Sequence, residues 1–90
     1  MMEPNSVQYR IIGGPRDGDD VQFEFGRVFD QIALMNDQGV NAVYKRKTIW
    51  VDAGTGSLTW RVYYVIDGMS REEFQSRAQG VEDAGRKTIS

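Results

Sequence analysis

The chain has 90 residues, a formal net charge of −2, and neither cysteine nor histidine. The lack of cysteine excludes a disulfide scaffold, a thiolate nucleophile and thiolate metal ligands, and the lack of histidine removes the commonest general base and metal ligand. The length suits one domain with a modest core, and the small negative charge gives no overall attraction to nucleic acid or anionic lipid.

The predicted elements begin with two short strands. Residues 7–12 and 21–25 both alternate apolar with polar side chains, which is typical of half-buried strands. The segment between them is rich in glycine and aspartate, so it is predicted to be an elaborated loop that joins the two strands in a hairpin. Residues 1–6 have neither the basic nor the apolar stretch of a signal peptide, and we expect them to form a flexible lead.

The segment 27–38 fits two structures. Its apolar residues follow a helical spacing, and Gly39 is suited to end such a helix. In the rival interpretation, residues 31–35 form a strand and residues 36–39 form the turn to a returning strand. We prefer the strand, because the turn residues suit a tight connection and the neighbouring segments are predicted to be β.

Two longer strands are predicted next, at 41–51 and 58–66, separated by a glycine-containing turn. In the second of these, even-numbered residues are apolar throughout, whereas odd-numbered residues become apolar only toward its end. The end of this strand is therefore predicted to be buried on both faces, as in a central strand or one covered by a helix.

A helix is predicted to start at residue 70 or 71. Ser70 and Glu73 have the spacing of a capping box, and Met69 and Phe74 occupy the positions of a hydrophobic staple. Gly80 is the expected end of this helix. A helix of this length is unstable alone, so we expect Phe74 to pack against the sheet.

Together these elements predict a β-dominated α+β domain over residues 7–81. We expect a four- to five-stranded antiparallel meander sheet with one C-terminal helix, and a small curled barrel built from the same strands is the alternative. Residues 82–90 are polar and aperiodic, and we expect them to form a frayed polar tail.

The loop after the first strand carries a distinctive motif. Its residues are Gly13, Gly14, Pro15, Asp17 and Gly18. The glycine spacing is that of a phosphate loop, but Asp19 and Asp20 stand where lysine and serine or threonine are required, and they would repel phosphate. A calcium loop is also disfavoured, because its glycine and glutamate positions are not matched. We interpret the motif as a structural turn with glycines at positive φ, and a small-ligand site there is an alternative.

The basic residues at 45–47 and the nearby aromatic side chains suggest another alternative, a surface for single-stranded nucleic acid. The candidate residues are Lys45, Lys47, Arg61, Tyr63 and Trp50. Alternation places the two lysines on one face, but the aromatic rings are also needed for the core. An edge strand protected from aggregation by lysines explains the same residues.

The segment from Tyr9 to Gly18 resembles the opening of a loose group of small uncharacterised bacterial and phage proteins. These proteins share an N-terminal strand–Gly-Gly-Pro-x-Asp-Gly–strand motif, and residues 60–64 are similar to the tyrosine-rich strand with which many of them end. The resemblance implies a small accessory or mobile-element protein, and it implies no activity and no functional residue.

No spacing of carboxylate, lysine, tyrosine, serine or threonine side chains identifies a nucleophile with its base, so we expect no enzymatic activity and no cofactor or metal. We expect instead an accessory protein that binds other proteins. The lack of cysteine and of a membrane-length apolar segment favours the cytoplasm and disfavours a membrane partner. The oligomeric state is left open, with an edge-strand homodimer as one alternative.

Overall fold

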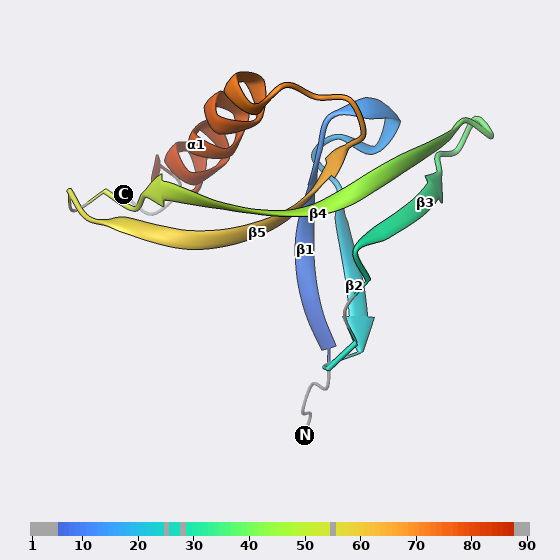
Figure 1. Ribbon diagram of the computed structural model, residues 1–90, viewed down its shortest axis with the longest axis horizontal. Helices are drawn as coiled ribbons and strands as arrows, with labels where there is room; N and C mark the ends of the chain where they lie inside the picture. The colour runs from blue at the N-terminus through green and yellow to red at the C-terminus, as the bar shows by residue number, and fades with distance from the viewer. Residues whose placement is uncertain (1–5, 25, 28, 55, 88–90) are drawn as a thin grey trace.

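Five β-strands and one α-helix make up the described part of the chain, which in this computed structural model comprises residues 6–24, 26–27, 29–54 and 56–87. In chain order the elements are β1 (Ser6–Ile12), a short 3-10 turn η1 (Gly14–Arg16), β2 (Asp20–Glu24), β3 (Gln31–Met35), β4 (Asn41–Asp52), β5 (Leu58–Ile66) and α1 (Arg71–Lys87). The predicted β-dominated α+β fold with a C-terminal helix is confirmed (Figure 1).

The strands form one sheet in the order β2-β1-β5-β4-β3. Neighbouring strands pair antiparallel except β1 and β5, which run parallel with Ile11 opposite Tyr64 and Ile12 opposite Val65. The sheet is therefore mixed and curls into a half-barrel, and the expectation of a purely antiparallel meander is wrong on this point (Figure 1). The end of β5 is apolar on both faces, as is typical of a central strand with a parallel neighbour, and it lies between β4 and β1 in the sheet.

Two apolar clusters lie on opposite faces of the sheet, because side chains alternate along each strand. α1 lies across one face of β4 and β5 (Figure 1). The buried residues of the cluster under α1 are Ile12, Ile49, Val51, Tyr63, Val65, Phe74 and Ala78. The buried residues of the cluster inside the curl are Ile11, Tyr44 and Tyr64. The second half of β5 thus contributes to both clusters, as its sequence pattern predicts.

The strand interpretation of residues 31–35 is confirmed, because β3 occupies this segment and pairs antiparallel with the start of β4. The connecting turn is held by Asn36, whose Oδ1 accepts hydrogen bonds from the backbone N–H groups of Gln38 (2.9 Å) and Val40 (3.0 Å). Gly39 adopts a φ of 79° in this turn, a value that L side chains rarely adopt.

The start of α1 agrees with its capping signals. The Ser70 hydroxyl accepts a hydrogen bond from the backbone N–H of Glu73 (3.1 Å), as a capping box requires. The Glu73 carboxylate instead pairs with Arg77 (3.0 Å), one turn further along the helix. Phe74 is buried in the cluster under α1, and Met69 packs against the same cluster, so the predicted contact of this helix with the sheet is confirmed.

The expected end of the helix at Gly80 is wrong, because α1 continues to Lys87. A glycine in a helix interior costs only about 1 kcal/mol relative to alanine, and contacts beyond Gly80 offset that cost. Val81 packs against the cluster under α1, and the Glu82 carboxylate pairs with Arg61 of β5 (3.2 Å). Residues 82–87 therefore belong to the helix, whereas 88–90 and most of the expected N-terminal lead lie outside the described residues.

Candidate functional site

Among the described residues, the edge of β4 is open over part of its length, because β3 is much the shorter strand. β3 pairs with β4 only as far as Lys45, and the C=O of Asp30 then accepts a hydrogen bond from the N–H of Arg46 (2.9 Å). This bond shows that even-numbered residues of β4 direct their backbone groups away from β5. Thr48 and Trp50 are the next residues that face outward in this way.

Two glutamines of α1 cover the far end of this edge. Gln75 Nε2 donates a hydrogen bond to the C=O of Trp50 (3.3 Å). Gln79 accepts one from the N–H of Asp52 (2.9 Å) and donates one to its C=O (3.0 Å), so its side-chain amide takes the place of a neighbouring strand. Within the described part of the chain, nothing bonds the N–H or C=O of Thr48 or the N–H of Trp50.

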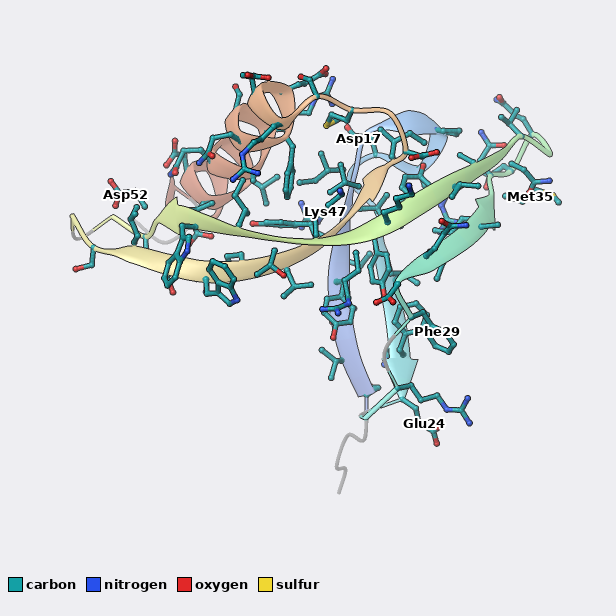
Figure 2. All side chains as sticks on the ribbon, viewed as in Figure 1. Asp17, Glu24, Phe29, Met35, Lys47 and Asp52 are labelled. Carbon is teal, nitrogen blue, oxygen red and sulfur yellow. The ribbon has the colours of Figure 1, made fainter. Side chains whose placement is uncertain are left out.

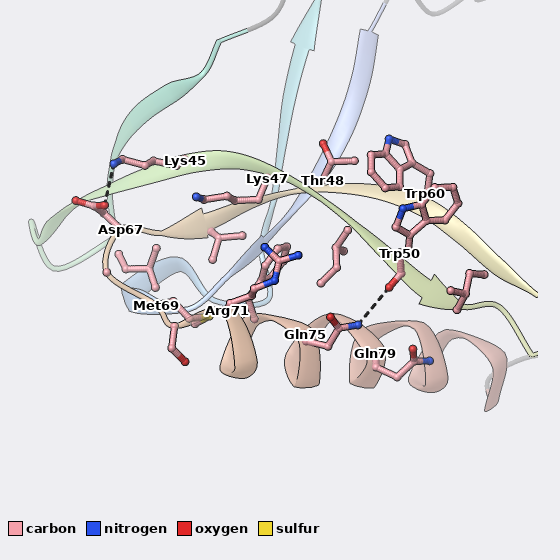
Figure 3. A pocket seen from close by; sticks show the side chains of 17 residues that line it. Lys45, Lys47, Thr48, Trp50, Trp60, Asp67, Met69, Arg71, Gln75 and Gln79 are labelled. Carbon is pink, nitrogen blue, oxygen red and sulfur yellow. Dashed lines mark hydrogen bonds and ion pairs between the residues drawn. The ribbon is translucent and has the colours of Figure 1, made fainter.

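A groove of about 600 Å³ lies between this open edge and α1, and we call it the β4–α1 groove (Figure 3). The lining residues that bear on its chemistry are Lys47, Thr48 and Ile49 of β4 and Met69, Arg71 and Phe74 at the start of α1. Figure 2 shows Lys47 on the side of β4 that α1 occupies. Since Ile49 and Phe74 belong to the cluster under α1, the floor of the groove is apolar.

The rim of the groove is positively charged, although the whole chain carries a net charge of −2. Lys45, Lys47 and Arg71 line it together with a single acidic residue, Asp67, which pairs with Lys45 (3.2 Å). Lys47 and Arg71 are exposed and form no ion pair with any described residue. In Figure 3 the Arg71 side chain extends from α1 toward β4, where Lys47 also lies.

The opposite face of β4 and β5 carries exposed aromatic side chains. Trp50 and Trp60 are direct cross-strand neighbours with ring centroids 4.3 Å apart, and each is 51% exposed. Leu58 is 63% exposed at the start of β5. Figure 3 shows both indoles on the side of β4 away from α1. Trp50 and Trp60 nevertheless border the β4–α1 groove, so their fluorescence is a natural reporter of its occupancy.

The residues proposed for a nucleic-acid surface are dispersed over the molecule. Lys45 and Lys47 lie beside the groove, whereas Trp50 projects from the opposite face. Tyr63 is only 4% exposed and belongs to the core under α1. Arg61 is held in an ion pair with α1 (3.2 Å). The structure therefore brings the two lysines together but does not join them to the aromatic rings in one open surface.

The glycine motif forms a turn packed closely on the sheet. Gly13 and Gly14 adopt positive φ angles of 87° and 68°, as predicted, and the Asp17 carboxylate accepts a hydrogen bond from the N–H of Gly13 (2.6 Å). The Tyr44 hydroxyl accepts a further hydrogen bond from the 3-10 turn (3.0 Å). A Cβ at Gly13 would lie 2.5 Å from the Ile66 side chain, so the space beside this loop is already filled by the protein itself.

Several residues of the groove were not singled out from the sequence, among them Thr48, Arg71, Gln75 and Gln79. The one available signal is that the two glutamines are four residues apart on the predicted helix and therefore share a face. The sequence does not say that this face meets the edge of a strand, because that depends on β3 ending before β4 does.

Among the described residues, no group of three or more acidic, histidine or cysteine side chains is placed to hold a metal ion. In the same part of the chain, no helix has the length and apolar character needed to cross a membrane. No protein-family model, curated protein or solved structure matches the sequence.

Proposed function

We propose that this protein is a non-enzymatic binding module that captures an extended segment of a partner protein on the open edge of β4. The observation that carries this proposal is that no described residue pairs with the N–H and C=O of Thr48 or with the N–H of Trp50, which face the β4–α1 groove. An unpaired strand edge is a template for a further strand, and strand addition is a recurring mode of peptide recognition.

The length of the open edge limits the size of the bound segment. A segment that pairs with the N–H and C=O of Thr48 and with the N–H of Trp50 runs beside β4 residue for residue, since both strands rise about 3.3 Å per residue. It therefore needs about four or five residues. Each such hydrogen bond contributes about 0.5–1.5 kcal/mol net, and side-chain contacts in the groove add to this. We expect dissociation constants of about 10 µM to 1 mM for short peptides.

This proposal accounts for more of the surface than the alternatives do. A nucleic-acid surface needs cations and stacking rings on one face, and here Lys47 and Trp50 project from opposite faces of β4. A ligand at the glycine motif would compete with the side chains of Ile66 and Met69 that pack there. The absence of cysteine agrees with a reducing compartment, and a cytoplasmic accessory role is part of the proposal.

The test begins with a phage-displayed library of random linear heptapeptides selected against the immobilised full chain. Binding of selected peptides is then measured by the tryptophan fluorescence of the wild type and of two variants. Thr48→Pro removes the outward-facing N–H and leaves the pairing of β4 with β5 intact, because that N–H points away from β5. Thr48→Val keeps the N–H and is the matched control.

We expect the Thr48→Pro variant to bind selected peptides at least about tenfold more weakly, while Thr48→Val binds like the wild type. Circular dichroism and thermal melting establish that both variants are folded. Equal binding by a folded Thr48→Pro variant contradicts the proposal. A concentration-dependent dimer that dissociates in Thr48→Pro also contradicts it, because the edge would then be occupied by a second copy of the chain.

A further inference from the structure

The alternation of side chains along β4 determines which side chains of a bound segment point toward α1 and which point to the opposite face. In a strand added to β4, the residue opposite Thr48 exchanges backbone hydrogen bonds with it and projects to the face that carries Trp50. The residues on either side lie opposite Lys47 and Ile49, and they project toward α1. A bound segment therefore presents two side chains, two positions apart, to the interior of the groove.

The position opposite Lys47 is suited to an acidic side chain. Lys47 and Arg71 both line this part of the groove, and neither forms an ion pair with a described residue. A carboxylate there would lie directly across from Lys47 and close to the guanidinium that extends from α1 (Figure 3). A lysine or arginine at the same position would meet two uncompensated positive charges.

The position opposite Ile49 is suited to an apolar side chain. Ile49 and Phe74 belong to the cluster under α1, and Met69 packs against the same cluster. All three line the groove. An aliphatic side chain placed here would extend the core, whereas a charged one would lose its hydration without gaining a partner.

The direction of the segment follows from strand energetics. Antiparallel pairing is slightly more stable per residue than parallel pairing, and β4 is antiparallel to both of its neighbours in the sheet. In that direction the residue opposite Ile49 comes first and the residue opposite Lys47 comes two positions later. We infer that the groove recognises an extended segment with the pattern apolar–x–acidic, an inference that rests on the proposed function.

The inference is tested with capped pentapeptides that differ only in this pattern. The probe is acetyl-Thr-Ile-Thr-Glu-Thr-amide, and its controls replace Glu by Gln or by Lys, or exchange the Ile and Glu positions. Affinity for the full chain is measured by tryptophan fluorescence, which only the protein contributes. We expect the Glu peptide to bind about three- to tenfold more tightly than the Gln peptide at low salt, with the ratio approaching one at about 0.5 M salt.

Charge-reversal variants locate this preference on the protein. Lys47→Glu and Arg71→Glu should each reduce the preference for Glu over Gln, and Lys47→Glu should favour the Lys peptide. Arg27→Glu makes the same change in net charge beyond the end of β2, away from the groove, and should leave the preference unchanged. A change of peptide preference in the groove variants but not in Arg27→Glu distinguishes a direct contact with the peptide from an effect of the protein's overall electrostatic field.

Three results would overturn the inference. The first is equal affinity for the Glu and Gln peptides, and the second is tighter binding of the peptide with exchanged positions. The third is no binding of any of these peptides up to about 1 mM, the upper end of the expected range of dissociation constants. The library selection with Thr48→Pro still reports independently on edge pairing, so failure of the pattern is distinguishable from failure of the proposed function.

Discussion

Gly13 and Gly14 allow the loop after β1 to lie directly against side chains of the sheet. A Cβ on Gly13 would lie 2.5 Å from Ile66 Cγ2 and 2.6 Å from Met69 Cε, whereas a Cβ on Gly18 would meet nothing within 4 Å. Gly13 and Gly18 have positive φ angles, 87° and 90°, so alanine strains the backbone at either position.

We therefore predict that Gly13→Ala lowers the free energy of unfolding by about 2–4 kcal/mol, which combines backbone strain with overpacking. Gly18→Ala, which carries the strain alone, should cost about 1 kcal/mol. Urea denaturation of both variants measures the difference. Equal losses would mean that the loop does not pack against Ile66 as described.

The buried phenol of Tyr63 links stability to alkaline pH. Burial, with a smaller effect of the Glu82 carboxylate, raises the pKa of Tyr63 above its ordinary value of 10.0. Burial also raises the pKa of Tyr64, whose hydroxyl donates a hydrogen bond to the C=O of Phe29 (2.5 Å). In both cases the folded state holds the proton more tightly than the unfolded state does.

The protein should consequently keep its full stability below about pH 10 and lose it as the pH rises further, because the unfolded chain ionises first. Each such tyrosine contributes a slope of up to about 1.4 kcal/mol per pH unit between its unfolded and folded pKa values. Urea midpoints from pH 8 to pH 11 should fall less steeply for Tyr63→Phe than for the wild type. Identical pH profiles would show that Tyr63 is not buried as the core under α1 requires.

At the scale of elements, α1 depends on its contact with the sheet through Phe74. This ring is 7% exposed and packs edge-on against Tyr63, with ring centroids 6.1 Å apart. We predict that Phe74→Ala lowers the free energy of unfolding by about 3–5 kcal/mol, as core aromatic truncations do. The exposed Ser76→Ala is the control and should change it by less than about 0.5 kcal/mol.

Denaturant midpoints and helical circular dichroism measure both effects. If Phe74→Ala cost less than about half a kcal/mol, the helix would be only loosely attached to the sheet. The β4–α1 groove would then lack a fixed wall, and the geometry used for peptide recognition would not apply.

Local signals predicted most of the elements but not how they join. The capping residues Ser70 and Glu73 predicted the start of α1. The turn residues at 36–39 correctly favoured a strand over a helix for the segment that forms β3. The parallel contact of β1 with β5 was missed, because pairing between distant strands leaves no periodic mark in the sequence. The length of α1 was also missed, since Glu82 is stabilised by Arg61, a residue on another element.

The same limit applies to the candidate site. Strand alternation correctly placed Lys45 and Lys47 on one face of β4, which is the face turned toward α1. Alternation also places Trp50 on the other face, but it could not show which face α1 covers, or that no described residue pairs with the N–H and C=O of Thr48. Both facts depend on where β3 ends and where α1 packs, and these are properties of the assembled fold.

At the scale of the whole molecule, the described residues leave one stretch of the β4 edge uncovered. β3 pairs with the first part of β4, the glutamines of α1 pair with its end, and Thr48 lies between them. Natural proteins usually pair, shorten or charge an exposed strand edge to prevent aggregation. Lys47 beside this stretch is consistent with such protection and, in the proposed function, also with the recognition of an acidic segment.

Backbone amide hydrogen exchange by NMR, in the free protein and with the tightest library-selected peptide at saturation, tests strand addition most directly. We predict that exchange slows at least about tenfold at Thr48 and Trp50, because their N–H groups gain partners, and stays unchanged at Lys47 and Ile49, whose groups already pair with β5. Protection that omits Thr48 and Trp50, or that centres on the glycine motif or on Leu58 and Trp60, would contradict it.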